Sequence, residues 1–239
     1  EAALRLTVNA LNADLARYEH TPQLIGDLDL IHRLAAAPGD PALVEATNRK
    51  LAELNAALMA SDIYLIRPDG ETIAASNHLD GPNSFVGRNF SYRPYFTEAM
   101  QGGAGRFYGI GTASGIRGYF FSAPVRDAEG AITAVVAVKI GVDRIEDAWR
   151  GGDYQVMVTD PDGTAFLASD PAWLYHSLNP LTPDRARQAR LLHCQADDPT
   201  LAALREDAAR LRVIVDQVAS LTDVSAAAWH ARLAPPPRY

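Results

Sequence analysis

The feature that most constrains this chain is the run Ile132 to Ile140, which is almost entirely apolar and yet contains Lys139. A short run of β-branched residues of this kind predicts a buried strand. Lys139 shares one face of that strand with Val135 and Ala137, because side chains alternate between the two faces of a strand. A lysine in such a strand either extends to solvent at the strand end or faces a polar cavity. We favour the cavity, because two arginines and several hydroxyls can be placed on the same sheet.

Long helices are predicted before any strand. Residues 1–20 have an apolar residue at alternating spacings of four and three, which is the repeat of a coiled-coil face. The residues of this seam are Leu4, Val8, Leu11, Leu15 and Tyr18. The seam predicts a homodimer through the N-terminal helix, and it fits equally well a helix that packs on its own domain. Pro22 marks a kink or a new start. Asp40 and Pro41 suit the N-cap and first position of a second long helix.

After residue 60 the pattern changes to short strands separated by turns. The predicted strands of one antiparallel sheet are 63–66, 72–75, 106–110, 118–125 and 132–140. A short helix over 93–101 interrupts them, and we expect Ser91 or Tyr92 to cap it. The fold class is therefore α+β, with a helical stalk over 1–60 and a first sheet module over 61–150.

A second copy of the pattern follows Gly151 and Gly152, the predicted domain boundary. The turn Asp160-Pro161-Asp162-Gly163 repeats Arg67-Pro68-Asp69-Gly70, and the flanking residues alternate in the same way. This indicates an internal repeat, with a second, smaller module over 151–239. The further elements that we predict are a helix at 143–149, strands at 154–159 and 164–169, a helix at 182–190, and strands at 210–215 and 229–233. A helix over 200–221 is the alternative for the last part of the chain.

Composition and motif searches exclude several classes of function. The net charge of −7 argues against general nucleic-acid binding. Cys194 is the only cysteine, which excludes an internal disulfide and a cysteine-rich zinc site. No run approaches the roughly 20 apolar residues of a membrane helix, and no signal peptide precedes Glu1. We therefore expect a mature secreted domain or a soluble fragment, although a small intact enzyme has the same features.

Catalytic motifs are missing as well. The chain has no Gly-rich phosphate loop, no G-x-S-x-G nucleophile elbow, and histidines without metal-ligand spacing. We expect no catalytic activity, no metal and no cofactor, although a catalytic set assembled from residues far apart in the sequence stays open. A small hydrolase is disfavoured because no nucleophile–base pair can be named. A purely structural dimerisation module is disfavoured because basic residues occur in a core strand and at a helix start.

Three cations form the candidate site. A small dicarboxylate needs two separate cationic anchors, since burying a carboxylate without a partner is costly. Arginine is well suited, because its planar fork can bind a carboxylate through two parallel hydrogen bonds. Arg93 stands at a predicted helix start, where backbone N–H groups also favour an anion. Arg117 begins a strand, and Lys139 lies in the apolar run. Taken singly, Arg93 fits a capping or surface residue and Arg117 a solvent-facing hairpin residue.

Several motifs resemble one known family. Ser91-Tyr92-Arg93-Pro94-Tyr95-Phe96 and the stretch from Tyr108 to Gly115 resemble the membrane-distal module of double Cache (tandem PAS-like) sensor domains. The stretch from Gly118 to Val125 and the closing strand with Lys139 narrow the resemblance to C4-dicarboxylate-transport sensor histidine kinases. The resemblance covers most of the chain, is strong over 60–150 and thins after Asp170.

The resemblance implies a fold, a site and a cellular context. The fold is a long helix carrying two PAS-like modules, of which the distal one binds succinate, fumarate or malate. The residues that match the family's pocket are Arg93, Tyr95, Thr112, Ser114, Gly115, Arg117, Tyr119 and Lys139. The parent is expected to be an inner-membrane sensor kinase of a two-component system for dicarboxylate uptake. This chain is expected in the periplasm, attached through flanking membrane segments that it lacks, with a dicarboxylate transporter as a further partner.

The alternative is a chemoreceptor or another sensor for a different small carboxylate or an amino acid. An α-amino ligand would need a buried carboxylate opposite the arginines. Residues 91–122 contain only Glu98, which lies on the predicted short helix. This disfavours the amino-acid alternative without removing it.

Overall fold

The computed structural model of the chain describes residues 2–111, 114, 116–152, 155–159, 163, 165–174, 176 and 178. The chain divides into two compact units, one of residues Ala13–Val142 and one of Glu1–Asn12 with Asp143–Tyr239. The elements predicted over 182–190, 200–221, 210–215 and 229–233 lie outside the described residues. In the described part of the chain, no helix has the length and apolar character needed to cross a membrane.

Four helices precede the first strand: α1 (Ala2–Glu19), α2 (Thr21–Gly26), α3 (Asp29–Ala36) and α4 (Pro41–Leu58). Pro22 lies in the first turn of α2, where a missing N–H costs nothing, so the predicted break is a new helix start. Asp40 caps α4 as predicted, and its carboxylate accepts hydrogen bonds from the N–H groups of Ala42 (2.9 Å) and Leu43 (3.2 Å).

The C-terminal part of the apolar seam of α1 is buried against residues of the same chain. Leu11, Leu15 and Tyr18 are all buried, and the Tyr18 hydroxyl donates to the Leu58 carbonyl at 3.2 Å. This is the arrangement expected of a helix that packs on its own domain. The homodimer through this helix remains a prediction.

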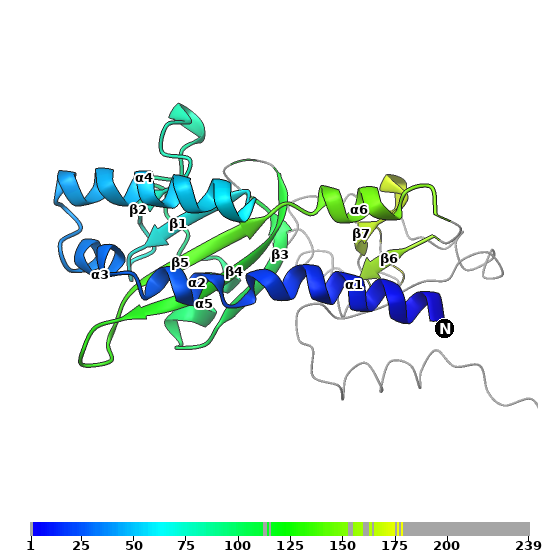
Figure 1. The fold of residues 1–239 in the computed structure, drawn as a ribbon, viewed down its shortest axis with the longest axis horizontal. Helices are drawn as coiled ribbons and strands as arrows, with labels where there is room; N and C mark the ends of the chain where they lie inside the picture. The colour runs from blue at the N-terminus through cyan, green and yellow to red at the C-terminus, as the bar shows by residue number, and fades with distance from the viewer. Residues whose placement is uncertain are drawn as a thin grey trace, which may run out of the picture. The chain divides into compact units, whose positions relative to one another are not determined.

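A five-stranded antiparallel sheet forms the centre of the unit Ala13–Val142, as predicted (Figure 1). Its strands are β1 (Asp62–Ile66), β2 (Thr72–Ala75), β3 (Gly105–Ile110), β4 (Arg117–Arg126) and β5 (Ile132–Ile140). The spatial order is β2-β1-β5-β4-β3, so β5 lies in the middle of the sheet. This central position explains the apolar run, because every residue from Ala134 to Ile140 is buried.

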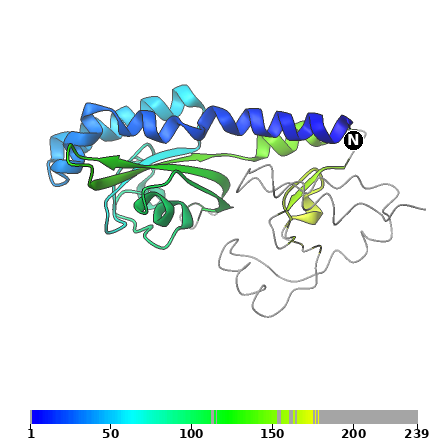
Figure 2. The same ribbon diagram turned by 90° about the horizontal axis from the view of Figure 1, so that it is seen from below.

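Helices cover both faces of this sheet (Figure 2). Helices α2 and α4 contact one face, and α5 (Pro94–Met100) lies against the other. The ring of Tyr95 on α5 stacks on Phe120, with ring centroids 5.1 Å apart, so Phe120 faces α5. Phe120 is the cross-strand partner of Lys139, which therefore faces α5 too.

The predicted cap of α5 was wrong. Arg93 occupies the N-cap position without a side-chain capping bond, and Pro94 starts the first turn. The Ser91 hydroxyl donates instead to the Asn89 side-chain oxygen at 2.7 Å, and Tyr92 is exposed. Ser91 is therefore committed to the loop before the helix, which also contains the 3-10 turn η1 (Gly81–Asn83).

The second unit contains α6 (Asp143–Trp149), the hairpin β6 (Met157–Thr159) and β7 (Ala165–Ala168), and the 3-10 turn η2 (Pro171–Trp173). Its hairpin has the register of β1 and β2. The pairs Tyr64↔Ala75 and Leu65↔Ala74 correspond to Met157↔Ala168 and Val158↔Leu167, and both hairpins contain a register shift at the next residue. The two described hairpins therefore share a pairing pattern, and the division of the chain into two repeated modules stays a prediction.

Candidate functional site

Lys139 is buried, with 1% of its side chain exposed, and among the described residues a hydroxyl, a carboxylate and an aromatic ring lie near its ammonium. The Nζ atom donates to Ser114 Oγ at 3.0 Å, and Asp62 Oδ2 lies 3.7 Å away. The ring of Phe120 lies 5.9 Å from Nζ. Asp62 and Phe120 are the cross-strand partners of Lys139 on its two sides, so strand register alone brings them together.

Two glycines provide the space that Lys139 occupies. A β-carbon on Gly118 would lie 2.7 Å from Cε and 2.8 Å from Cγ of Lys139. A β-carbon on Gly111 would lie 2.6 Å from Ser114 Oγ and 3.1 Å from Lys139 Nζ. Side chains at these two positions would therefore displace the lysine or its hydroxyl partner.

Arg93 is the second buried cation, with 3% of the residue exposed. Its guanidinium carbon lies 4.8 Å from the ring centre of Phe107 and 5.4 Å from that of Phe120. A guanidinium over aromatic faces is attracted to their negative π surface. Arg93 and Lys139 thus reach the same Phe120 ring from different elements, one from the start of α5 and one from β5.

A pair of buried tyrosines lies next to Arg93. The hydroxyls of Tyr64 on β1 and Tyr95 on α5 are 2.6 Å apart. Burial raises the pKa of Tyr95 to about 12, and its hydrogen bonds with Tyr64 and Arg93 act in the opposite direction. Burial also raises the pKa of Tyr64. Both hydroxyls are therefore neutral at physiological pH and can act as hydrogen-bond donors.

Asp62 is a member of this cluster that the sequence prediction missed. Its side chain is 14% exposed. Burial raises the pKa of Asp62, the nearby Lys139 lowers it, and Asp80 raises it. Tyr64 and Phe107 were missed as well. The available signal was the alternation of β1, which puts Asp62 and Tyr64 on one face, but only the pairing of β1 with β5 places that face beside Lys139.

The structure brings together four of the eight predicted site residues: Arg93, Tyr95, Ser114 and Lys139. Thr112 and Gly115 lie outside the described residues. Arg117 begins β4 and is partly exposed. Tyr119 lies on the opposite face of the sheet beside Phe121, with ring centroids 4.8 Å apart, because it alternates with Phe120. Burial raises the pKa of Tyr119 to about 12.

The cluster has the chemistry of an anion-binding site. Two buried cations, the tyrosine hydroxyls and the Ser114 hydroxyl are all donors, and Asp62 is a carboxylate among them. Buried cations and hydrogen-bond donors favour an anion as their partner, so the chemistry of this cluster matches an anionic ligand. Among the described residues, no three histidine, cysteine, aspartate or glutamate side chains are grouped to hold a metal ion.

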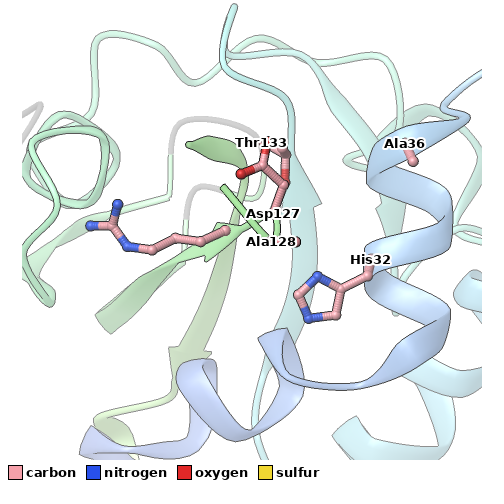
Figure 3. Close-up of a pocket in the computed structure, with 6 residues that line it drawn as sticks. His32, Ala36, Asp127, Ala128 and Thr133 are labelled. Carbon is pink, nitrogen blue, oxygen red and sulfur yellow. The ribbon is translucent and has the colours of Figure 1, made fainter. Parts of the chain in front are cut away.

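A pocket of about 460 Å³ lies elsewhere in the same unit (Figure 3). Its lining residues are His32, Ala36, Arg126, Asp127, Ala128 and Thr133. His32 extends from α3 towards the β4–β5 turn, where Asp127 and Ala128 lie. None of the clustered site residues lines it, so this pocket is separate from the cation cluster.

Comparison with known proteins identifies relatives for most of the chain. The crystal structure of the sensor domain of the Vibrio cholerae histidine kinase DctB has 34% sequence identity and a TM-score of 0.77, and the match covers 84% of this chain and 78% of that one. The C4-dicarboxylate transport sensor protein DctB of Pseudomonas aeruginosa is 41% identical over 179 residues, which are 75% of this chain and 29% of the relative. The protein of the same name from Rhizobium meliloti is 32% identical over 185 residues, 77% of this chain and 29% of the relative. The chain thus spans 29% of the length of these two curated relatives.

A different family matches a short part of the C-terminal region. The profile described as "Phosphohydrolase-associated domain" matches residues 186–232. These residues fall within the range predicted as the second module and outside the residues that the structure describes.

Proposed function

Since this chain belongs to the family of DctB sensor domains, we propose that it binds C4-dicarboxylates and signals to the histidine kinase of a two-component system that controls dicarboxylate uptake. The kinase activity belongs in this proposal to the longer parent protein, and this chain is the sensing part without catalysis of its own.

The convergence of Arg93 and Lys139 is the observation that carries this proposal. Both cations are buried, both lie beside the Phe120 ring, and neutral hydroxyls of Tyr95 and Ser114 lie next to them. Two separated cations with intervening donors match a short molecule that has a carboxylate at each end. We propose that these four residues contact the ligand directly.

The remaining predicted residues have different parts in the proposal. Thr112, Gly115 and Arg117 are close to Ser114 in the sequence, and their contact with the ligand stays a prediction from the resemblance. Tyr119 acts indirectly, because it lies behind the sheet and supports β4, on which Phe120 is located. A ligand contact by Tyr119 is the part of the original prediction that the strand alternation disfavours.

The cellular context is also proposed. We place the chain in the periplasm, as the extracytoplasmic part of an inner-membrane protein whose membrane segments flank it. We keep the homodimer and the dicarboxylate transporter as proposed partners. The names of the relatives support the two-component context, since they describe a sensor protein and a histidine kinase.

Calorimetric titration of the chain with succinate, fumarate and malate tests the proposal. Lys139→Met keeps most of the aliphatic stem and removes the charge, and should weaken binding at least about tenfold, as expected for the loss of a charge-assisted hydrogen bond. Lys50→Met is the matched control, because Lys50 is exposed on α4 and pairs with Glu53. Failure of the wild type to bind any of the three acids would overturn the proposal.

Asp62 supports a second candidate, a sensor of an amino-containing acid. It supplies a carboxylate that is only 14% exposed, whereas the carboxylate of residues 91–122, Glu98, is exposed. Asp62 lies 3.7 Å from Lys139, however, so the amino group of such a ligand would have to compete with the lysine ammonium for it. Titration with L-aspartate beside succinate separates the two candidates, since tighter binding of L-aspartate would favour the second.

A further inference from the structure

We propose that Asp62 sets the charge selectivity of the site by competing with the ligand for the ammonium of Lys139. This inference rests on the proposed function and deepens it. It predicts that the Lys139 end of the site accepts an uncharged polar group, such as a carboxamide, nearly as well as a carboxylate. The ligand class is then a C4 acid with one obligatory carboxylate at the Arg93 end.

The geometry of Asp62 is the first argument. Asp62 is paired directly with Lys139 across β1 and β5, and its Oδ2 atom lies 3.7 Å from Nζ. Cross-strand partners on one face stay adjacent as long as the strands remain paired. A carboxylate that binds Lys139 must therefore approach Asp62 as well, and the two negative charges repel each other.

The ammonium does not depend on Asp62 alone for its position. Ser114 Oγ accepts a hydrogen bond from it at 3.0 Å, and the Phe120 ring lies 5.9 Å away. The stem also occupies the space beside Gly118. Removing the charge of Asp62 should therefore leave Lys139 in place, available to a ligand and without the competing anion.

The negative charge of Asp62 can repel a ligand carboxylate because solvent reaches Asp62 only in part. Its side chain is only 14% exposed, so water screens it incompletely. Its neighbours have opposing effects, because Lys139 favours the ionised carboxylate whereas burial and Asp80 disfavour it. An added ligand carboxylate would join Asp80 in opposing the ionised form.

The test is a thermodynamic cycle between one charge on the protein and one on the ligand. Succinate and succinamate have nearly the same size, and succinamate has a carboxamide in place of one carboxylate. Asp62→Asn should tighten succinate about tenfold, which is about 1.4 kcal/mol. The same variant should weaken succinamate, because the carboxamide loses the carboxylate to which it donates. Equal changes for both ligands, or weaker binding of succinate, would overturn the inference.

Two further variants separate charge from fold. Asp29→Asn is the matched control, since the Asp29 side chain is 86% exposed on α3, and it should leave both affinities unchanged. Asp62→Glu keeps the charge and should keep the wild-type preference between the two ligands. If the wild type binds neither ligand, the proposed function fails together with the inference. If the wild type binds both and Asp62→Asn changes nothing, only the inference fails.

A measurement on the wild type covers the case in which Asp62→Asn does not fold. The Asp62 carboxyl can be titrated by carbon-13 NMR with and without saturating succinate, with Asp62→Glu identifying its resonance. Bound succinate should move the titration midpoint of Asp62 to higher pH, because the ligand adds negative charge and shares Lys139. An unmoved midpoint would show that the ligand does not compete with Asp62.

Discussion

Gly118→Ala tests whether the space left by Gly118 on β4 is needed for the Lys139 side chain to reach its position in the site. The added β-carbon would lie 2.7 Å from Cε and 2.8 Å from Cγ of Lys139, and 3.1 Å from the Ile140 carbonyl oxygen. Carbon atoms are in favourable contact at about 3.5–4.0 Å, so the stem of Lys139 has to move. The backbone of Gly118 is not in the left-handed region, so the penalty is steric rather than conformational.

The expected magnitude follows from two opposing terms. Overpacking a well-packed core costs about 1–3 kcal/mol. Replacing glycine by alanine at a compatible backbone returns about 0.4–1 kcal/mol by restricting the unfolded chain. We therefore expect a net loss of about 1–2 kcal/mol in the free energy of unfolding. Displacement of the ammonium from Ser114 should also weaken succinate by about tenfold or more, since a hydrogen bond to a charged group contributes about 1.5–3 kcal/mol.

Substitutions at two other glycines serve as comparisons. Stability is measured by urea unfolding and succinate affinity by calorimetry. Gly39→Ala meets nothing within 4 Å and should leave both stability and binding unchanged or raise stability slightly. Gly105→Ala should destabilise more than Gly118→Ala, because its β-carbon would lie 2.3 Å from the Tyr95 carbonyl oxygen, and backbone yields less readily than a lysine stem. Unchanged stability and unchanged succinate affinity in Gly118→Ala would refute the steric argument.

Three further predictions concern hydroxyls and buried acceptors. Tyr95→Phe leaves the Tyr64 hydroxyl without its 2.6 Å partner and should lower the free energy of unfolding by about 1–3 kcal/mol in urea; a change near zero would show that the pair contributes nothing. Asn48→Ala removes the oxygen that accepts from the Ala75 N–H at 2.8 Å and should cost a similar amount, with faster amide exchange at Ala75 as its specific sign. The raised pKa of Tyr95, about 12 against an ordinary 10.0, stabilises the fold fully below pH 10, and this contribution is lost as the pH rises through about 12. Between pH 10 and 12 the free energy of unfolding of Tyr95→Phe should therefore fall less steeply than that of the wild type. Part of the fall should remain, because Tyr119 has a pKa of about 12 as well. The same dependence of unfolding free energy on pH in both proteins would contradict this.

Local chemistry made most of the elements in the first unit predictable. Asp40 and Pro41 mark the start of α4, and the apolar run over 132–140 marks the strand that became the centre of the sheet. The cap of α5 was misjudged because Ser91 had an alternative partner, Asn89, two residues earlier in the same loop. Short-range sequence signals therefore predicted the positions of the helices and strands. They did not predict whether the Ser91 hydroxyl caps α5 or bonds to Asn89.

Only those site residues could be predicted whose type is unusual for their sequence surroundings. Arg93 and Lys139 are charges in apolar surroundings, so they could be identified without a structure. Asp62 reaches Lys139 through the pairing of β1 with β5, which are far apart in the sequence. Tyr119 was assigned to the site from the sequence, and it alternates with Phe120 on β4, so its contact with the ligand stays a prediction that the register between β4 and β5 disfavours.

The comparison of the two hairpins gives a physical reason to place the proposed dicarboxylate site in the first module. The two hairpins share strand register. In each, the hydroxyl oxygen of the serine after the second strand accepts a hydrogen bond from a backbone N–H near the start of the first: Ser76 from Ile63 at 2.9 Å, and Ser169 from Val156 at 3.0 Å. In each, a helix also supplies a buried acceptor to the outer strand, Asn48 to Ala75 and Glu146 to Ala168.

These shared contacts satisfy backbone groups, and they are what the fold itself requires. In the described hairpin of the second unit, two polar residues of the cluster, Asp62 and Tyr64, have no equivalent of the same chemistry. By the register of the two hairpins, Tyr64 corresponds to Met157, which has no hydroxyl, and Asp62 corresponds to Gln155, which has no charge. The described part of the second hairpin thus keeps the scaffold and lacks the counterparts of Asp62 and Tyr64, so the competition that we propose between Asp62 and a ligand for Lys139 belongs to the first module.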